Sequence, residues 1–133
     1  MRTMLRLATA LAALLIASTA LAQTGTATLS WTAPTQRTDG STLAAGELTN
    51  YVISWGQCAG TSPNWTMPAS VTTATVAASV TTYTATGLTT GWTNPHCFVV
   101  ASVSVSGTGP ASTPPVTKLI EAPAKAPTAV TVK

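Results

Sequence analysis

Charged residues are scarce in this chain. Only 7% of its 133 residues are Asp, Glu, Lys or Arg, and it has one His and two Cys. So few titratable side chains leave little material for acid–base catalysis or for a metal site, which needs several such ligands. The chain also lacks an uninterrupted apolar run of about 20 residues, the length that a membrane-spanning helix requires. These scarcities argue against most enzymes, against metal centres and against a membrane span.

The first 22 residues have the composition of a secretory signal peptide. Arg2 and Arg6 precede or flank an apolar stretch at residues 7–17, and the segment ends in Ala20-Leu21-Ala22. A basic start, a short apolar stretch and small residues at alternate positions mark a cleaved export signal. The alternative is a membrane anchor, for which the stretch is too short. We therefore expect cleavage after Ala22 and a secreted, periplasmic or cell-surface protein.

Cleavage there would remove part of the positive charge. The whole sequence has a net charge of +3, whereas residues 23–133 carry four basic and three acidic side chains. Proteins that bind nucleic acid present clustered basic residues, often interleaved with aromatic ones. The sequence has no such cluster. We expect no nucleic-acid partner, no cofactor and no metal ligands.

The rest of the chain is rich in Thr and Ser and is divided by Pro and Gly. Its apolar and polar residues alternate, which is typical of β-strands with one buried face. The alternation places Ala27, Leu29 and Trp31 on one face of a first strand. It places Tyr51, Ile53 and Trp55 on one face of a second strand. The expected strands are residues 27–31, 51–55, 65–67, 71–77, 80–86, 96–105 and 115–120, with a loop at 35–50 and turns at 56–63, 87–91 and 107–115. About seven short strands in one domain indicate an all-β sandwich.

Four short motifs occur in a characteristic order. They are Leu29-Ser30-Trp31 with Pro34, then Tyr51-Val52-Ile53, then Tyr83 with Gly87-Leu88 and Gly91, and finally Gly107-Thr108-Gly109-Pro110. Together they resemble the fibronectin type III family, in the compact form of secreted bacterial and phage proteins, over residues 26–120. The resemblance implies an immunoglobulin-like β-sandwich of about seven antiparallel strands at residues 23–121. It also implies a role in interaction rather than catalysis.

The sequence departs from the family in two places. His96 stands where the family has its corner tyrosine, after an insertion at residues 92–95. The family's first strand has no counterpart between the expected cleavage site and residue 26, but residues 126–132 of the Pro/Ala-rich tail (122–133) resemble such a strand. Its candidate pairing residues are Pro127, Ala129, Val130 and Val132. This segment either adds a strand to a sheet, in its own molecule or in a neighbouring one, or it is a frayed tail.

Two cysteines in an exported chain favour one disulfide over free thiols or a metal site. In the fold implied by the resemblance, Cys58 follows one strand and Cys97 begins the antiparallel strand beside it. Counted from inward Tyr51 and inward Phe98, both cysteines face outward on the same sheet. A disulfide between Cys58 and Cys97 is therefore expected.

Few residues are candidates for a functional site. Asp39 and Glu47 share one loop and could form a paired-carboxylate site, but Asp39-Gly40 also fits an ordinary turn and Glu47 an exposed position. Trp65 and Trp92 fall outside the inward alternation. They are candidates for contacting a glycan or a protein, or else they cover edges of the sandwich.

The sequence thus predicts a secreted, non-catalytic binding or adhesion module whose protein or glycan ligand is unknown. The alternative is a structural subunit that self-associates by donating its C-terminal strand. A third and weaker hypothesis is an enzyme that uses Asp39 and Glu47.

Overall fold

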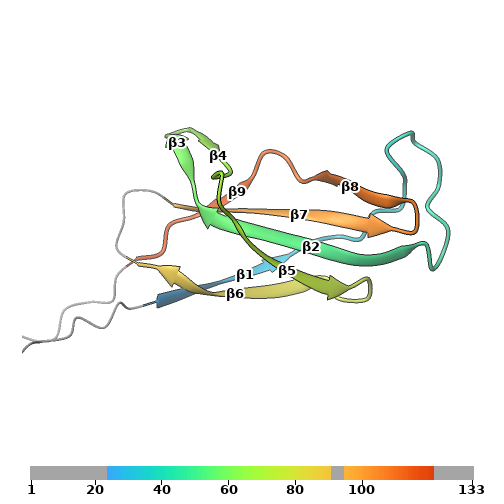
Figure 1. Ribbon diagram of the computed structural model, residues 1–133, viewed down its shortest axis with the longest axis horizontal. Helices are drawn as coiled ribbons and strands as arrows, with labels where there is room; N and C mark the ends of the chain where they lie inside the picture. The colour runs from blue at the N-terminus through green and yellow to red at the C-terminus, as the bar shows by residue number, and fades with distance from the viewer. Residues whose placement is uncertain (1–23, 91–94, 122–133) are drawn as a thin grey trace, which may run out of the picture.

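The computed structural model describes residues 24–90 and 95–121, and within them it contains nine β-strands and no helix (Figure 1). The strands are β1 (Thr24–Ser30), β2 (Leu48–Gln57), β3 (Ala59–Thr61), β4 (Asn64–Thr66), β5 (Thr72–Ala77), β6 (Thr82–Thr89), β7 (His96–Ser104), β8 (Gly107–Ala111) and β9 (Val116–Lys118). All their pairings are antiparallel. The expected all-β, antiparallel class is confirmed. In these same residues no helix is long and apolar enough to cross a membrane.

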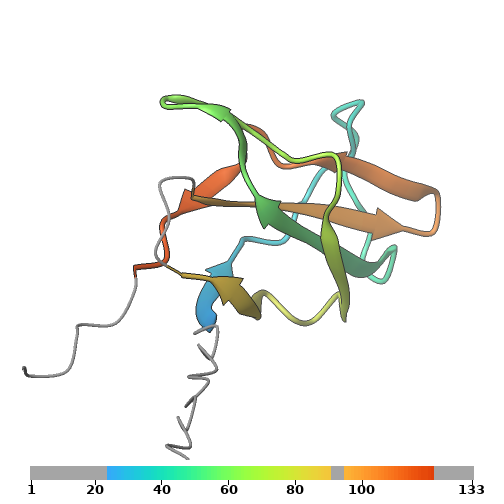
Figure 2. The ribbon, with the colours of Figure 1, turned by 60° about the vertical axis from the view of Figure 1, so that its left-hand side comes forward.

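The strands form two layers that pack face to face (Figure 2). The larger sheet has the order β5-β2-β7-β8, and β9 pairs with the first residues of β7. The smaller layer consists of β1 and β6, and β3 and β4 form a separate hairpin. Each layer has one apolar face, and packing the two faces together removes both from water. This is the arrangement of a β-sandwich.

Alternate side chains from both layers fill the space between them. The buried apolar cluster consists of Ala27, Tyr51, Ile53, Trp55, Ala85, Leu88, Phe98 and Ile120. Trp31 packs edge-on against Tyr51, with ring centroids 5.2 Å apart. Trp55 lies against Tyr83 with centroids 5.6 Å apart. The inward faces predicted for residues 27–31 and 51–55 are therefore confirmed.

The turn expected at residues 87–91 begins later than predicted. Strand β6 continues to Thr89, and its pairing with β1 shifts register between Gly25 and Ala27. Gly87 has a φ of 71°, a conformation that other residues rarely adopt, and it lies in the irregular part of the ladder. Between the pairs that Gly25 and Ala27 form, β6 has one residue more than β1. This bulge lets β6 continue beyond Gly87, and Leu88 is buried.

Two other segments expected to be turns are partly strands. Within 107–115, β8 pairs with β7 although it contains two glycines and Pro110. These residues favour turns, but β8 is an outer strand, where a proline is tolerated. Within 56–63, β3 pairs with β4. Residues 24–90 and 95–121 therefore form nine strands rather than about seven. The strand expected at 65–67 is β4 at Asn64–Thr66.

The end of the described chain closes one end of the sandwich. After β9, the chain crosses from the larger layer toward the smaller one, where β1 begins (Figures 1 and 2). Ile120 is 8% exposed and belongs to the core. A methyl group added to Gly25 would overlap with Cγ2 of Ile120. Because Gly25 has no side chain, Ile120, two residues after β9, can pack closely against the start of β1.

This contact predicts the effect of a single methyl group. We expect Gly25→Ala to lower the free energy of unfolding by about 1–3 kcal/mol, because a packed site cannot absorb the added volume. Gly109→Ala is the matched control, since its Cβ would meet Ser102 at 3.4 Å, an ordinary contact. Urea unfolding measures both. This packing would be contradicted if Gly25→Ala and Gly109→Ala lowered the free energy of unfolding equally. It would also be contradicted if Gly25→Ala cost as much in a protein that already has Ile120→Ala as it does in the unaltered protein.

Candidate functional site

An apolar groove runs between the smaller layer and the larger one along β1. Its volume is about 450 Å³. Strand β1 and the residue after it contribute residues 27–31, β7 contributes Phe98 and Val100, and β9 contributes Val116–Lys118. The groove therefore lies where the edges of the two sheets, β1 and β9, face each other.

Several apolar side chains of this groove remain accessible to water. Leu29, Trp31 and Val100 pack against the core but are only partly buried, and Val116 is 65% exposed. Exposed apolar groups gathered in a concave site indicate a binding surface more than scattered ones do. The groove is therefore a candidate binding surface.

Backbone groups at one wall of the groove lack a strand partner. Among the described residues, β1 pairs with β6 and with no other strand. Backbone N–H and C=O groups of a strand alternate between its two sides, so about half of those in β1 point away from β6. The open edge that the sequence indicated, from the absence of a first strand, is thus present in the described part of the chain.

The indole of Trp31 adds a polar group at the same place. Its Nε1 atom is buried and has no hydrogen-bond acceptor among the described residues. A buried N–H without an acceptor costs free energy. Trp31 follows β1 directly, and its side chain lines the groove. The site therefore combines apolar walls, the indole of Trp31 and a strand edge that no described strand pairs with.

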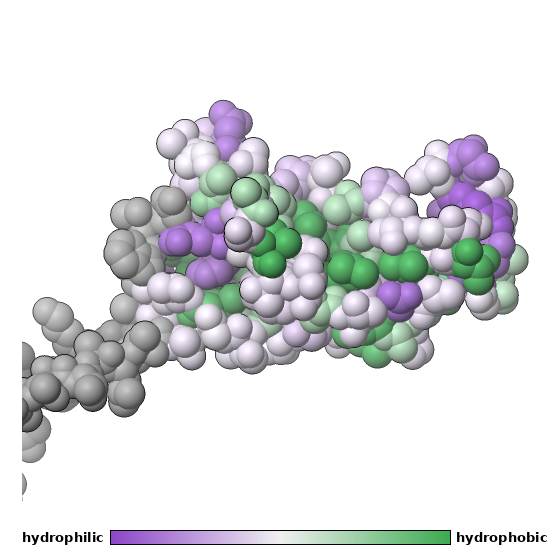
Figure 3. Space-filling model, viewed as in Figure 1, coloured by the Kyte–Doolittle hydropathy of each residue, from purple (hydrophilic) through white to green (hydrophobic). Residues whose placement is uncertain are grey.

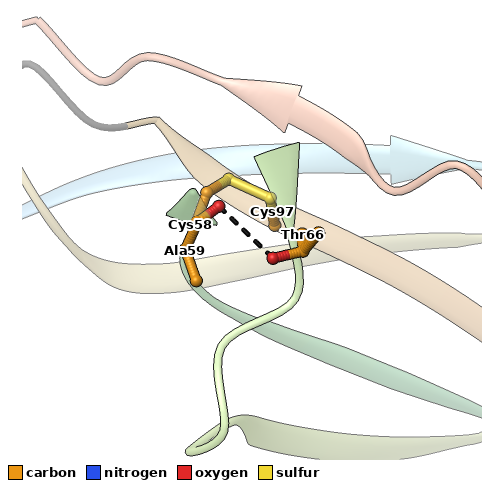
Figure 4. Close-up of a disulfide and its surroundings, with 4 residues drawn as sticks. All are labelled: Cys58, Ala59, Thr66 and Cys97. Carbon is orange, nitrogen blue, oxygen red and sulfur yellow. Dashed lines mark hydrogen bonds between the residues drawn. A yellow bond between two sulfur atoms is a disulfide. The ribbon is translucent and has the colours of Figure 1, made fainter. Parts of the chain in front are cut away.

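The predicted disulfide is present (Figure 4). Cys58 and Cys97 are bonded, with Cα atoms 5.0 Å apart and 39 positions apart in sequence. Gly56 pairs with Cys97 in the ladder of β2 and β7, so Cys58 lies just beyond the last pairs. The Cys58 N–H also donates to the carbonyl of Pro95 at 2.9 Å.

The two cysteines, which were predicted on an outward face of the sheet, are not exposed to solvent. Both cysteines are buried, with Cys58 3% and Cys97 0% exposed. The β3–β4 hairpin follows Cys58 directly, and Thr66 of β4 donates to the carbonyl of Ala59 at 3.4 Å. Of this hairpin, the strand predicted at residues 65–67 corresponds to β4, whereas β3 was not predicted, because Gly56 and Pro63 indicated a turn. The disulfide fastens two strands of one sheet at the end where the hairpin lies.

Of the two candidate tryptophans, one lies in the described part of the chain. Trp65 lies in β4, where it is half-buried and pairs with Gly60. Trp92 lies outside the described residues, as do the tail residues Pro127, Ala129, Val130 and Val132 and the signal segment 1–22. Their proposed roles therefore stay predictions.

The acidic residues of the long loop between β1 and β2 have structural partners. Glu47 accepts hydrogen bonds from Arg37 and from the Ala44 N–H, the latter at 2.6 Å. Asp39 accepts from the N–H and hydroxyl of Ser41. Figure 3 shows hydrophilic residues gathered on this loop. The turn expected at Asp39-Gly40 is confirmed, but Glu47, expected to be simply exposed, is half-buried and ion-paired.

These hydrogen bonds also set the charge state of the two acids. The Ser41 hydroxyl holds the pKa of Asp39 below its ordinary value, with help from the Ser41 N–H. The Ala44 N–H, followed by Arg37, lowers the pKa of Glu47. A general acid at neutral pH needs a raised pKa instead. A second hollow of about 200 Å³ beside Arg37 is lined largely by Ser, Thr and Gly, and Arg37 is engaged by Glu47, Ser41 and Thr42.

His96 is buried at the start of β7. It is 6% exposed, and its Nδ1 atom has no partner among the described residues. Burial lowers the pKa of the imidazole, because the charged form loses hydration. The corner hydrogen bond of the resembled family is therefore not made through Nδ1. Within the described ranges, no three His, Cys, Asp or Glu side chains are grouped to hold a metal ion.

Comparison with known proteins gives no further guide to this site, since no protein-family model, curated protein or solved structure matches the chain. The geometry of the described residues and the sequence therefore carry the functional argument.

We predict that loss of the disulfide is costly. Replacing both Cys58 and Cys97 by Ala should lower the free energy of unfolding by about 4 kcal/mol, because the bond closes a loop of 39 positions in the unfolded chain. Urea unfolding under oxidising conditions measures the loss. Thr66→Ala, which removes only an exposed hydrogen bond, should cost less than about 1.5 kcal/mol. A double variant as stable as the oxidised protein would contradict the prediction.

We also predict a pH dependence that originates at His96. The unfolded chain takes up a proton near the ordinary value of 6.5, whereas the folded chain resists protonation. The free energy of unfolding should therefore be constant above that pH and fall as the pH is lowered below it. His96→Gln should flatten this slope as the pH falls through the ordinary imidazole value of 6.5, whereas a slope from the lowered pKa of Glu47 would persist in both proteins. Parallel profiles for the two proteins, measured by urea unfolding, would rule out His96 as the source.

Proposed function

We propose that this protein is an exported, non-catalytic binding or adhesion module of the fibronectin type III kind, and that it binds an extended polypeptide segment along β1. The observation that carries the proposal is the apolar groove beside the unpaired edge of that strand. An extended peptide can add to a free strand edge through backbone hydrogen bonds while its alternate side chains enter pockets.

Export is supported by two independent features. Residues 1–22 have the order of basic, apolar and small residues of a cleaved signal. The Cys58–Cys97 disulfide is of a kind that persists in oxidising compartments such as the periplasm or the extracellular space. We therefore place the protein outside the cytoplasm, at the cell surface, in the periplasm or secreted.

The chemistry of the groove favours a polypeptide over a glycan. Its walls at Leu29, Phe98, Val100 and Val116 are aliphatic or aromatic. A glycan could stack on Trp31, but it has no alternating N–H and C=O groups to pair with the edge of β1, whereas a peptide has them. A strand with apolar side chains at every second position satisfies both the walls and the free backbone groups of β1.

The non-catalytic part of the proposal rests on the ionisable groups. Asp39 and Glu47 are held ionised by local hydrogen bonds, and neither lines the β1 groove. His96, the sole histidine, is buried and also absent from the lining. Lys118 lines the groove, but no carboxylate or imidazole lies in the lining to act with it, which suits binding better than acid–base catalysis.

The test uses the chain from residue 23 to 122, which includes the whole described core. The probe is the peptide Lys-Thr-Val-Thr-Val-Thr-Val-Lys, which is soluble and alternates. We expect it to shift one of the four indole N–H signals in the nuclear magnetic resonance spectrum, namely that of Trp31. The same peptide with prolines at its two central positions cannot pair along a strand and should not bind.

Two equally exposed valines supply matched variants. Val116 is 65% exposed and lines the groove, whereas Val105 is 70% exposed and does not. Val116→Lys should weaken peptide binding about tenfold or more, because a charge would be placed among apolar walls. Val105→Lys should leave it unchanged. If the alternating peptide does not bind, or if both variants bind it equally, the groove is not the binding site.

A further inference from the structure

We infer that the occupant of the β1 groove is residues 126–132 of a second copy of this chain, so that copies join head to tail by strand donation. The inference rests on the proposed function, because it names the extended segment that the groove takes. It is carried by the place where the described chain ends, the direction in which it leaves, and the sequence that follows.

The chain leaves the sandwich at the end where β1 begins. In the ladder of β7 and β9, Lys118 pairs with His96, the first residue of β7. Two residues later, Ile120 packs beside Gly25 at the start of β1. Figure 1 shows β9 running toward this end and the described chain stopping there. The described chain therefore ends close to the first residues of β1, beyond the last pairs of the larger sheet.

The direction of exit decides between the molecule's own groove and a neighbour's. To enter its own groove, the segment would have to reverse at once and then run parallel to β1. To enter a copy stacked on this end, it would continue outward and meet the other end of that copy's groove, near Trp31. It would then run antiparallel to the copy's β1. Antiparallel pairing is slightly the more stable of the two, and all the ladders in the described chain are antiparallel.

The sequence after Glu121 suits this path. Residues 126–132 number seven, as many as β1 has. Val130 and Val132 share one face of a strand, and Thr131 lies on the other, so two valines would meet the apolar walls while threonine faces solvent. Pro127 comes at the start of the segment, where a strand tolerates the loss of an N–H. Residues 122–125 can span at most about 14 Å, which is enough to bridge two adjoining sandwiches.

A contact of this kind is head to tail, because the segment of one copy meets the groove of the next. Each copy has one groove and one segment, so an open chain of copies has one groove free at one end and one segment free at the other. Head-to-tail interfaces generate rings where the rotation between copies closes and open filaments where it does not. The protein would then be the subunit of a ring or a filament outside the cell.

Complementation between two defective chains tests the inference. The acceptor is the chain of residues 23–122, which has a groove and no segment. The donor is the chain of residues 23–133 with Leu29→Lys, which keeps the segment and has a charge in its groove. Each should be monomeric alone, and an equimolar mixture should give a one-to-one complex by light scattering during size exclusion. The unaltered chain of residues 23–133 should form larger species whose mass rises with concentration.

Variants in the segment serve as controls, because they lie outside the described fold. Adding Val130→Lys to the donor should abolish the complex, whereas adding Thr131→Lys should preserve it. If Leu29→Lys prevents folding, Val116→Lys at an exposed position replaces it. The absence of a one-to-one complex would overturn the inference, as would an unaltered chain that stays monomeric at all concentrations.

The failure of this inference is distinguishable from the failure of the proposed function. If the alternating peptide binds the acceptor but the donor does not, the groove takes a strand from another protein. If neither binds, the groove is not a strand site and both statements fall. A monomeric full chain whose segment fills its own groove also overturns donation while leaving the groove as a strand site.

Discussion

The unequal size of the two layers is the constraint on which the rest of the structure depends. The larger sheet extends over four strands and β9, while the smaller layer has only β1 and β6 among the described residues. Two strands cannot cover the whole inner face of the larger sheet. Apolar side chains of β7 and β9 are therefore left facing a groove, and the backbone edge of β1 borders it. The candidate site is a consequence of this difference in size.

The other notable features stabilise the sandwich at its ends. The Cys58–Cys97 disulfide fastens β2 to β7 at one end of their ladder, and Ile120 packs beside Gly25 at the end where β1 begins. At the opposite end, Arg37 and Glu47 hold the long loop between β1 and β2 in place. Arg37 and Glu47 thus stabilise the architecture, and the groove, where Lys118 is the one ionisable residue of the lining, offers mainly apolar contacts and backbone hydrogen bonds.

Much of this architecture could be predicted from residue patterns. Alternation identified the buried faces at Ala27 and at Tyr51, Ile53 and Trp55, because a sheet with one buried face imposes a period of two. The disulfide was predicted from the strand order that the family resemblance implies, together with the positions of the two cysteines. The strand β8 could not be predicted, since its glycines and proline favour turns and only pairing with β7 makes them a strand. The groove was also beyond the sequence, which indicated an open edge but not which side chains border it.

Amide hydrogen exchange along β1 tests the central claim, that this strand has an edge reserved for another strand. In the chain ending at residue 122, exchange should alternate from residue to residue, because every second N–H of β1 is bonded to β6 and the others are free. In the chain of residues 23–133, the free N–H groups should become slow to exchange. Uniformly slow exchange along β1 in the shorter chain, or identical exchange in both chains, would contradict the account.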